Sequence, residues 1–179
     1  MRRTRRAPGR GVRHRGFTMV ELIVVIVLIG IVSTVAVSRF FERGAFDAAA
    51  WADQLTSMLR HGQKIAVAQN RPVFVLLAPE RAALCFAAQA DCPPALQVRA
   101  PGGANSGSDA TREACGSDSW MCEAAPAGLA VTVPAAAIRF DGLGRASAGN
   151  PAGARYAIAV EGDGVTRTIG IEAETGYVD

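Results

Sequence analysis

The chain has 179 residues, of which 50% are hydrophobic and 20% are charged, and its formal net charge is +3. This composition excludes a disordered, highly charged chain, and the length fits one domain with an appendage. The first 16 residues hold seven arginines and no acidic residue. Removing these seven from the 19 basic residues leaves 12 against 16 acidic ones, a net charge of −4. The overall charge therefore gives no support for nucleic-acid binding by the folded part.

Residues 17–38 form an apolar segment in which Glu21 is the single charged residue. As an α-helix these 22 residues are just long enough to cross the hydrocarbon core of a bilayer, which is about 30 Å thick. The arginines before the segment place its N-terminal side in the cytoplasm, so the chain after residue 38 should lie outside it. The sequence thus predicts a basic leader over residues 1–16 and a transmembrane helix over residues 17–38.

The apolar segment differs from two common kinds of N-terminal segment. A secretory signal has a shorter apolar core and a small-residue cleavage site, and no such site follows here. A plain signal anchor does not explain Glu21, because a charge inside a spanning helix costs about 2.5–3.5 kcal/mol on insertion scales. Another interpretation is that Glu21 merely reaches interfacial water at the cytoplasmic end of the helix.

The string GFTMVEL at residues 16–22 resembles the N-terminal signal of type IV pilins and type II secretion pseudopilins. That signal has a basic leader ending in glycine, then phenylalanine, and glutamate at the fifth mature position. The resemblance implies cleavage between Gly16 and Phe17 by a prepilin peptidase, N-methylation of Phe17, and an assembly role for Glu21. In a fibre Glu21 would neutralise the Phe17 amine of a neighbouring subunit, where a low dielectric strengthens the pair. Ser38 stands where such pilins often have proline, which predicts a straighter helix there.

The helical pattern can continue to Asn70, because no proline occurs between residues 17 and 71. Residues 39–70 are amphipathic, so this half of the helix should pack on a head formed by residues 71–179. The predicted buried stripe is Ala48, Trp51, Ala52, Leu55, Met58, Leu59, Gly62, Ile65, Ala66 and Gln69. The predicted opposite face is Asp53, Gln54, Arg60, Gln63 and Lys64.

The chain after Pro72 reads as short strands separated by turns. One hairpin is predicted from residues 73–77 and 83–87, and another from 155–160 and 166–171 around a turn at 161–164. Further strands are predicted at 129–133 and 137–140, and residues 101–128 are expected to form a long loop. The fold class is therefore α+β, with a long N-terminal helix packed on an antiparallel, β-sandwich-like head.

Two further regions extend the resemblance. Residues 39–72, together with 138–142 and 171–178, resemble the FimT/GspH group of minor pilins, most closely the C-type minor pilin of mannose-sensitive haemagglutinin (MSHA) pili. Residues 88–128 match nothing in that group. The resemblance implies a subunit held in the inner membrane, with the N-terminus in the cytoplasm and the head in the periplasm, and later part of a fibre. The implied partners are the prepilin peptidase, other pilins and an inner-membrane assembly platform. An MSHA-like pilus, another type IV pilus and a type II secretion pseudopilus all remain open.

Two other functions compete with that of a structural subunit. Some FimT-like minor pilins are DNA receptors that use a basic C-terminal tail, but this chain ends TGYVD, so we do not expect nucleic acid as a partner. An enzyme on a signal anchor would have to use His61, the one histidine left after leader cleavage, and no phosphate-binding loop occurs. We therefore expect no enzyme, no catalytic residue and no cofactor.

The four cysteines allow three disulfide pairings, and disulfides are expected if the head lies in an oxidising periplasm. The spacing favours Cys85–Cys92 and Cys115–Cys122, because each pair closes a short C-x6-C loop. A zinc site would need C-x2–4-C spacing, which is absent, so no metal is expected.

Overall fold

The computed structural model describes residues 18–41, 43–149 and 155–179, with the backbone alone for residues 34–41. The predicted leader, Gly16 and Phe17 lie outside these residues. The chain divides into two compact units, residues 1–40 and 41–179, which are described separately. Helix α1, Met19–Phe41, includes Ser38 and forms nearly all of the described part of the first unit.

Helix α2, Arg43–Gln69, opens the second unit, which we call the head. The predicted helix over residues 17–70 is thus assigned as two helices, and Glu42 between them lies outside the described residues. At its end Asn70 takes a left-handed conformation with φ of 46°. The amide of Arg71 donates to the carbonyl of Ala66 and that of Asn70 to Val67, the bonding pattern of a Schellman cap. Asparagine tolerates this conformation, so α2 stops before Pro72.

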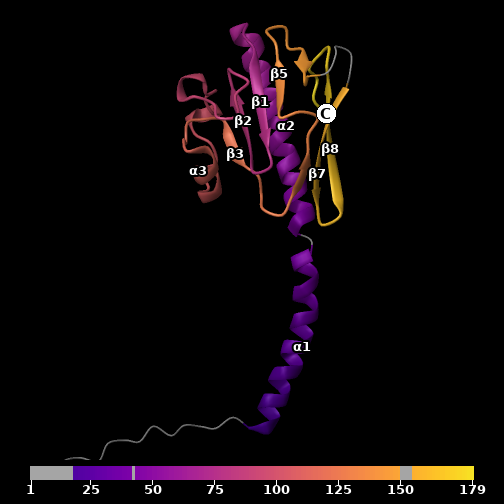
Figure 1. The fold of residues 1–179 in the computed structure, drawn as a ribbon. Helices are drawn as coiled ribbons and strands as arrows, with labels where there is room; N and C mark the ends of the chain where they lie inside the picture. Colours follow the sequence, from indigo (N-terminus) through magenta and orange to yellow (C-terminus); the bar gives the residue numbers. More distant parts are fainter. Residues whose placement is uncertain (1–17, 42, 150–154) are drawn as a thin grey trace, which may run out of the picture. The chain divides into compact units, whose positions relative to one another are not determined.

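Two antiparallel sheets form the rest of the head (Figure 1). The larger has the order β3-β2-β1-β5-β6 and the smaller the order β4-β7-β8. The bounds of the larger sheet are β1 Val73–Ala78, β2 Arg81–Cys85, β3 Cys122–Ala124, β5 Ala137–Phe140 and β6 Ala146–Ser147. Those of the smaller sheet are β4 Ala130–Thr132, β7 Arg155–Gly162 and β8 Val165–Glu172.

The β7–β8 hairpin has a tighter turn than the predicted 161–164. Gly162 pairs with Val165, so the loop is only Asp163 and Gly164. Both loop residues have positive φ, 48° and 75°, as a two-residue type I′ turn requires. The Asp163 carboxylate also accepts a hydrogen bond of 2.8 Å from the amide of Gly44, which ties the turn to the start of α2.

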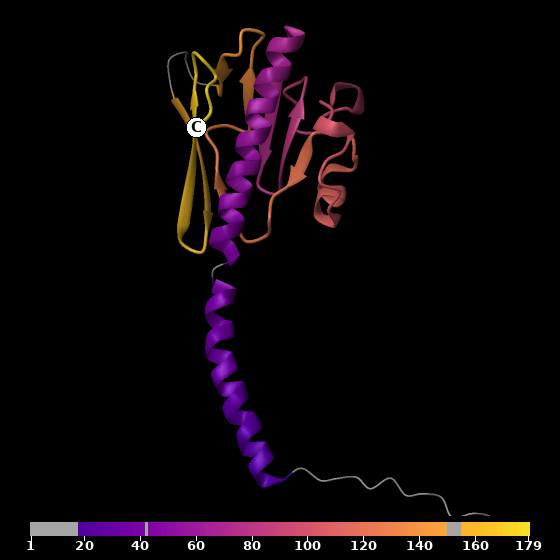
Figure 2. The same cartoon turned by 180° about the vertical axis from the view of Figure 1, so that it is seen from behind.

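The core of the head lies between α2 and both sheets (Figure 2). The predicted stripe of α2 is buried except for Ile65, which is half-buried, and Gln69, which is exposed. Facing it are buried aliphatic and aromatic side chains of β1, β5, β7 and β8: Val73, Val75, Ile138, Phe140, Tyr156, Ile158, Val160, Ile169 and Ile171. The α+β class, with a helix packed on antiparallel sheets, is therefore confirmed.

The prediction of a long loop over residues 101–128 is wrong. This region contains a 3-10 turn at Pro101–Gly103, helix α3 at Asp109–Cys115, and strand β3. The Ser108 hydroxyl caps α3 by accepting from the amide of Thr111 at 3.1 Å. Gly116, with φ of 67°, ends it. A second 3-10 turn, Pro94–Leu96, and the short strand β6 were also not predicted.

Candidate assembly site and the architecture of the head

Thr18 fixes the start of α1. Its hydroxyl accepts a hydrogen bond of 3.2 Å from the amide of Glu21, and its carbonyl accepts from Leu22 at 3.1 Å. Glu21 therefore lies in the first turn of α1, where a carboxylate is stabilised by the positive end of the helix dipole. Threonine three residues before glutamate is the capping-box spacing. This signal was present in the sequence, but Thr18 was not predicted.

The described side chains of α1 are apolar on every side of the helix. Their exposed fractions run from 39% at Val25 to 83% at Met19. The Ser33 hydroxyl donates to the carbonyl of Ile29 at 2.7 Å, so this polar group is satisfied inside the helix. A helix that is hydrophobic all round needs an apolar environment to cover it.

The structure leaves part of the predicted N-terminal site untested. Gly16 and Phe17 lie outside the described residues, so the cleavage site and the methylated amine are not placed relative to Glu21. Within the described residues no helix combines the length and the apolar character that crossing a membrane requires. Phe17 lies outside that description and residues 34–38 are described by their backbone alone, so the span stays a prediction.

Disulfides join Cys85 to Cys92 and Cys115 to Cys122, the pairs that the spacing favours. All four cysteines are buried in a small cluster with Trp120. The indole Nε1 of Trp120 donates to the carbonyl of Leu84 at 2.7 Å. The two bridges therefore hold loops around one buried side chain, beside β2 and β3.

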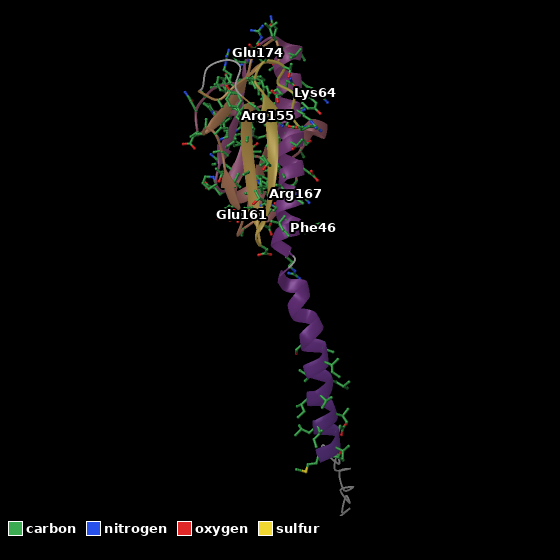
Figure 3. The ribbon with its side chains drawn as sticks, turned by 90° about the vertical axis from the view of Figure 1, so that its right-hand side faces the viewer. Phe46, Lys64, Arg155, Glu161, Arg167 and Glu174 are labelled. Atoms are coloured by element: carbon green, nitrogen blue, oxygen red, sulfur yellow. A yellow bond between two sulfur atoms is a disulfide. The ribbon has the colours of Figure 1, made fainter. Side chains whose placement is uncertain are left out.

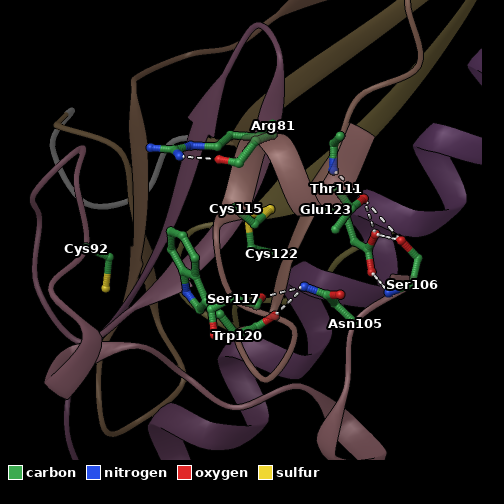
Figure 4. The surroundings of a disulfide bond; sticks show 12 residues. Arg81, Cys92, Asn105, Ser106, Thr111, Cys115, Ser117, Trp120, Cys122 and Glu123 are labelled. Carbon is green, nitrogen blue, oxygen red and sulfur yellow. Dashed lines mark hydrogen bonds between the residues drawn. A yellow bond between two sulfur atoms is a disulfide. The ribbon is translucent and has the colours of Figure 1, made fainter. Parts of the chain in front are cut away.

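Arg81 connects the loop closed by Cys85–Cys92 to the last turn of α3, beside the second disulfide (Figure 4). Its guanidinium donates to the carbonyls of Ala114 at 2.6 Å and Ala90 at 3.1 Å. It also lies over the Trp120 ring, 5.7 Å from the ring centre. A cavity of about 490 Å³ opens between the loops, with Arg81 and Trp120 in its lining. Arg81, which also pairs with Asp91 at 3.5 Å, thus holds the first loop against α3.

Glu123 has a buried carboxylate that organises residues 105–124 (Figure 4). It accepts from the Ser106 amide at 2.8 Å, the Ser106 hydroxyl at 2.5 Å and the Thr111 hydroxyl at 3.1 Å. Thr111 in turn accepts from the amide of Ala124 at 3.2 Å. This network explains why a segment rich in glycine, serine and alanine is ordered, since its backbone is tied to one charged acceptor.

Gln63 is predicted to lie on the polar face of α2. In the structure its side chain is half-buried and hydrogen-bonded. Its amide donates to the carbonyls of Gly144 at 3.1 Å and Thr175 at 2.8 Å. Gly176, with φ of 62°, lies so close to Gly144 and Gln63 that a β-carbon would not fit. Gln63 therefore joins the turn at Gly144 to the segment 171–178, which resembles minor pilins.

The C-terminus is bound to β8. Asp179 exchanges backbone hydrogen bonds with Gly170, at 3.1 and 3.2 Å, and its carboxylate pairs with Arg155 at 2.7 Å. The hydrogen bonds that Arg155 donates to Asp179 raise the pKa of the guanidinium, and the negative charges of Asp179 and Glu172 act in the same direction. Arg60 of α2 donates to the carbonyl of Val178 at 2.8 Å. Asp179 is therefore held by an ion pair and by backbone hydrogen bonds.

His61 is half-buried on α2 rather than freely exposed. Burial lowers its pKa, while a hydrogen bond to the backbone of Arg99 opposes the shift. Ser57 and Asp53 share a cavity with His61, but no hydrogen bond joins either of them to the imidazole in the described structure. The described residues also contain no cluster of three or more histidine, cysteine or acidic side chains able to hold a metal. In the described structure His61 therefore forms no nucleophile–base pair with Ser57, and the described side chains form no metal centre.

Comparison with known proteins agrees with this architecture. Residues 12–37 match the family model described as the prokaryotic N-terminal methylation motif. No curated protein matches the chain. The crystal structure of the type IV minor pilin FimU from Pseudomonas aeruginosa (strain PAO1) is similar, with a TM-score of 0.51 over 78% of this chain and 90% of that chain, at 14% identity. At this identity the likeness concerns the fold. The chain therefore combines an N-terminal methylation motif with a pilin-like fold.

Proposed function

We propose that the chain is a minor pilin or pseudopilin, a subunit that enters a fibre through α1. The observation that carries this proposal is the start of α1. There the methylation motif coincides with a capped first turn containing Glu21 and with a helix that is apolar on every side. A fibre core made of such helices supplies the apolar environment that α1 requires.

The proposed chemistry of Glu21 depends on processing of the leader. Cleavage after Gly16 creates a new amine on Phe17, which methylation leaves positively charged. In the apolar interior of a bundle, an unpaired carboxylate or amine is costly, and pairing the two removes both costs. Glu21 would thus admit a subunit only in the register that brings its carboxylate to a neighbour's amine. Before assembly, its position in the first turn keeps the carboxylate near the cytoplasmic membrane surface.

The finer assignment rests on the resemblance of residues 39–72 and 171–178. We propose an inner-membrane precursor with a periplasmic head, cleaved by a prepilin peptidase and assembled with other pilins by a membrane platform. An MSHA-like pilus is our first candidate, and a type II secretion pseudopilus the second. DNA reception is not favoured, because the chain without its leader has a net charge of −4.

The test compares Glu21→Ala, Glu21→Asp and wild type in cells that make the fibre. Fibres are sheared, pelleted and probed for this chain, and membrane levels and leader cleavage are measured in parallel. We expect Glu21→Ala to be inserted and cleaved normally but lost from the fibre, and Glu21→Asp to retain part of the incorporation. Wild-type incorporation of Glu21→Ala would mean that Glu21 is only an interfacial residue.

A further inference from the structure

The two cysteines of each disulfide differ in their access to solvent. Cys92 and Cys115 both line the cavity of about 490 Å³ beside Trp120, and they are 6% and 7% exposed. Their partners, Cys85 and Cys122, do not line this cavity and have no exposed surface. In Figure 4 the Trp120 ring lies between Cys92 and the pair formed by Cys115 and Cys122. Each bridge can therefore be reached through one of its two cysteines, and both routes start in the same cavity.

This asymmetry decides how either bridge can exchange with an external thiol. An attacking thiolate must approach the sulfur in line with the S–S bond, on the side opposite the sulfur that leaves. In the folded head a thiolate in the cavity meets Cys92 or Cys115, so it expels the thiolate of Cys85 or Cys122. The expelled sulfurs lie in a buried, largely apolar cluster, where a negative charge is disfavoured. The bridges therefore close again readily while the head stays folded.

Arg81 supplies a positive charge beside both accessible cysteines. Its guanidinium donates to the backbone carbonyls one residue before Cys115 and two residues before Cys92. Asp91 is the other charged residue among the described side chains that line the cavity, and its carboxylate is fully exposed. The Arg81 side chain is only 23% exposed, so water screens its charge less than that of Asp91. A thiolate or an anionic thiol reagent in the cavity is stabilised by such a cation.

We propose that this cavity is the site at which a protein disulfide oxidant forms both bridges of the folded head, through mixed disulfides with Cys92 and Cys115. The Cys92 thiolate attacks the oxidant's disulfide, which breaks as the mixed disulfide forms, and the oxidant's first thiolate leaves. The Cys85 thiolate then attacks Sγ of Cys92, forms the native bridge and releases the oxidant's second thiolate. Two electrons and the two thiol protons of the chain end on the oxidant, which becomes a dithiol. Cys115 and Cys122 react in the same way.

The proposal rests on the proposed function in one respect, because it needs the head to lie in an oxidising compartment. The choice of sulfurs does not depend on that compartment, since it follows from the cavity alone. Formation and reduction of a bridge pass through the same mixed disulfide, so the purified oxidised protein can be tested in the reverse direction.

The first experiment exposes the oxidised full-length chain in detergent briefly to reduced glutathione. Free thiols are then trapped with N-ethylmaleimide, and the glutathione adducts are located by peptide mapping. In native buffer we expect adducts at Cys92 and Cys115 to exceed those at Cys85 and Cys122 on the order of tenfold, because access selects the sulfur that is attacked. In concentrated urea this preference should disappear, since all four sulfurs are then accessible.

The second experiment tests Arg81 by comparing glutathione, which is anionic, with cysteamine, which is cationic. The ratio of the two rates of adduct formation cancels any general loosening of the loops in a variant. We expect this ratio to fall about threefold in Arg81→Gln and to be largely kept in Arg81→Lys. The matched control is Arg167→Gln, which removes an exposed arginine from β8 in the smaller sheet (Figure 3) and should leave the ratio unchanged.

Three results would overturn the proposal. The first is an equal distribution of adducts over the four cysteines in native buffer, or a preference for Cys85 or Cys122. The second is the formation of adducts in urea alone, since the cavity would then admit no thiolate. The third is a ratio that is unchanged in Arg81→Gln or that falls equally in Arg167→Gln, which would remove Arg81 from the site. The Glu21 variants test fibre assembly separately, so the two proposals can fail independently.

Discussion

Removal of either disulfide should destabilise the head by a similar and calculable amount. In each bridge the joined cysteines are seven residues apart in sequence. The chain-entropy relation for a loop of this length gives about 2.4 kcal/mol at 25 °C. For a head of this size the loss corresponds to a decrease in melting temperature of about 8 °C. Alanine is the appropriate replacement, because a serine hydroxyl in this buried cluster would add the cost of an unpaired polar group.

The two pairs should be replaced separately, as Cys85→Ala with Cys92→Ala and as Cys115→Ala with Cys122→Ala. Thermal unfolding of the full chain in detergent can be followed by near-ultraviolet circular dichroism, which reports on buried Trp120. Peptide mapping without reduction should first find the two local pairs in the wild type. A cross-link between Cys92 and Cys115, or a variant with an unchanged melting temperature, would refute the reasoning.

Three other changes probe the head. Glu123→Ala leaves the Ser106 amide and two hydroxyls without their acceptor and should cost about 3 kcal/mol, and Glu123→Gln about half as much, measured by urea unfolding. Gln63→Ala removes two hydrogen bonds and should cost about 2 kcal/mol. Burial lowers the pKa of His61 below 6.5, so its contribution to stability is present above pH 6.5 and is lost as the pH falls through the folded-state pKa. Between pH 7.5 and 5 the melting temperature of the wild type should therefore fall further than that of His61→Gln. Equal decreases in the two melting temperatures would contradict this.

Periodic and covalent features could be predicted from the sequence. The 3–4 spacing of apolar residues identified the buried face of α2 because one helix face must meet the core. The hairpins with predicted turns at residues 79–81 and 161–164 were found because apolar, strand-forming runs flank turn residues. The two disulfides were predicted because each of them closes a short C-x6-C loop. In each case the information lies within a few neighbouring residues.

Features that depend on distant contacts could not be predicted. Helix α3 has seven residues, too few for a periodic pattern, and it is held by Glu123 and by a disulfide. Gln63 looked like one more polar residue of an exposed face, since its partners lie 81 and 112 residues away. Strand β6 has two residues and exists because β5 offers it a free edge. The cap at Thr18 is different, because its capping-box spacing is local and could have been found.

The most direct test of the central claim is the mass of the chain's N-terminal peptide, measured on protein recovered from sheared fibres. Our account predicts a peptide that begins at Phe17 and carries one additional methyl group, because cleavage after Gly16 precedes assembly. A peptide that still contains the arginine leader, or consistent absence of the chain from fibres of cells with an active prepilin peptidase, would contradict the account.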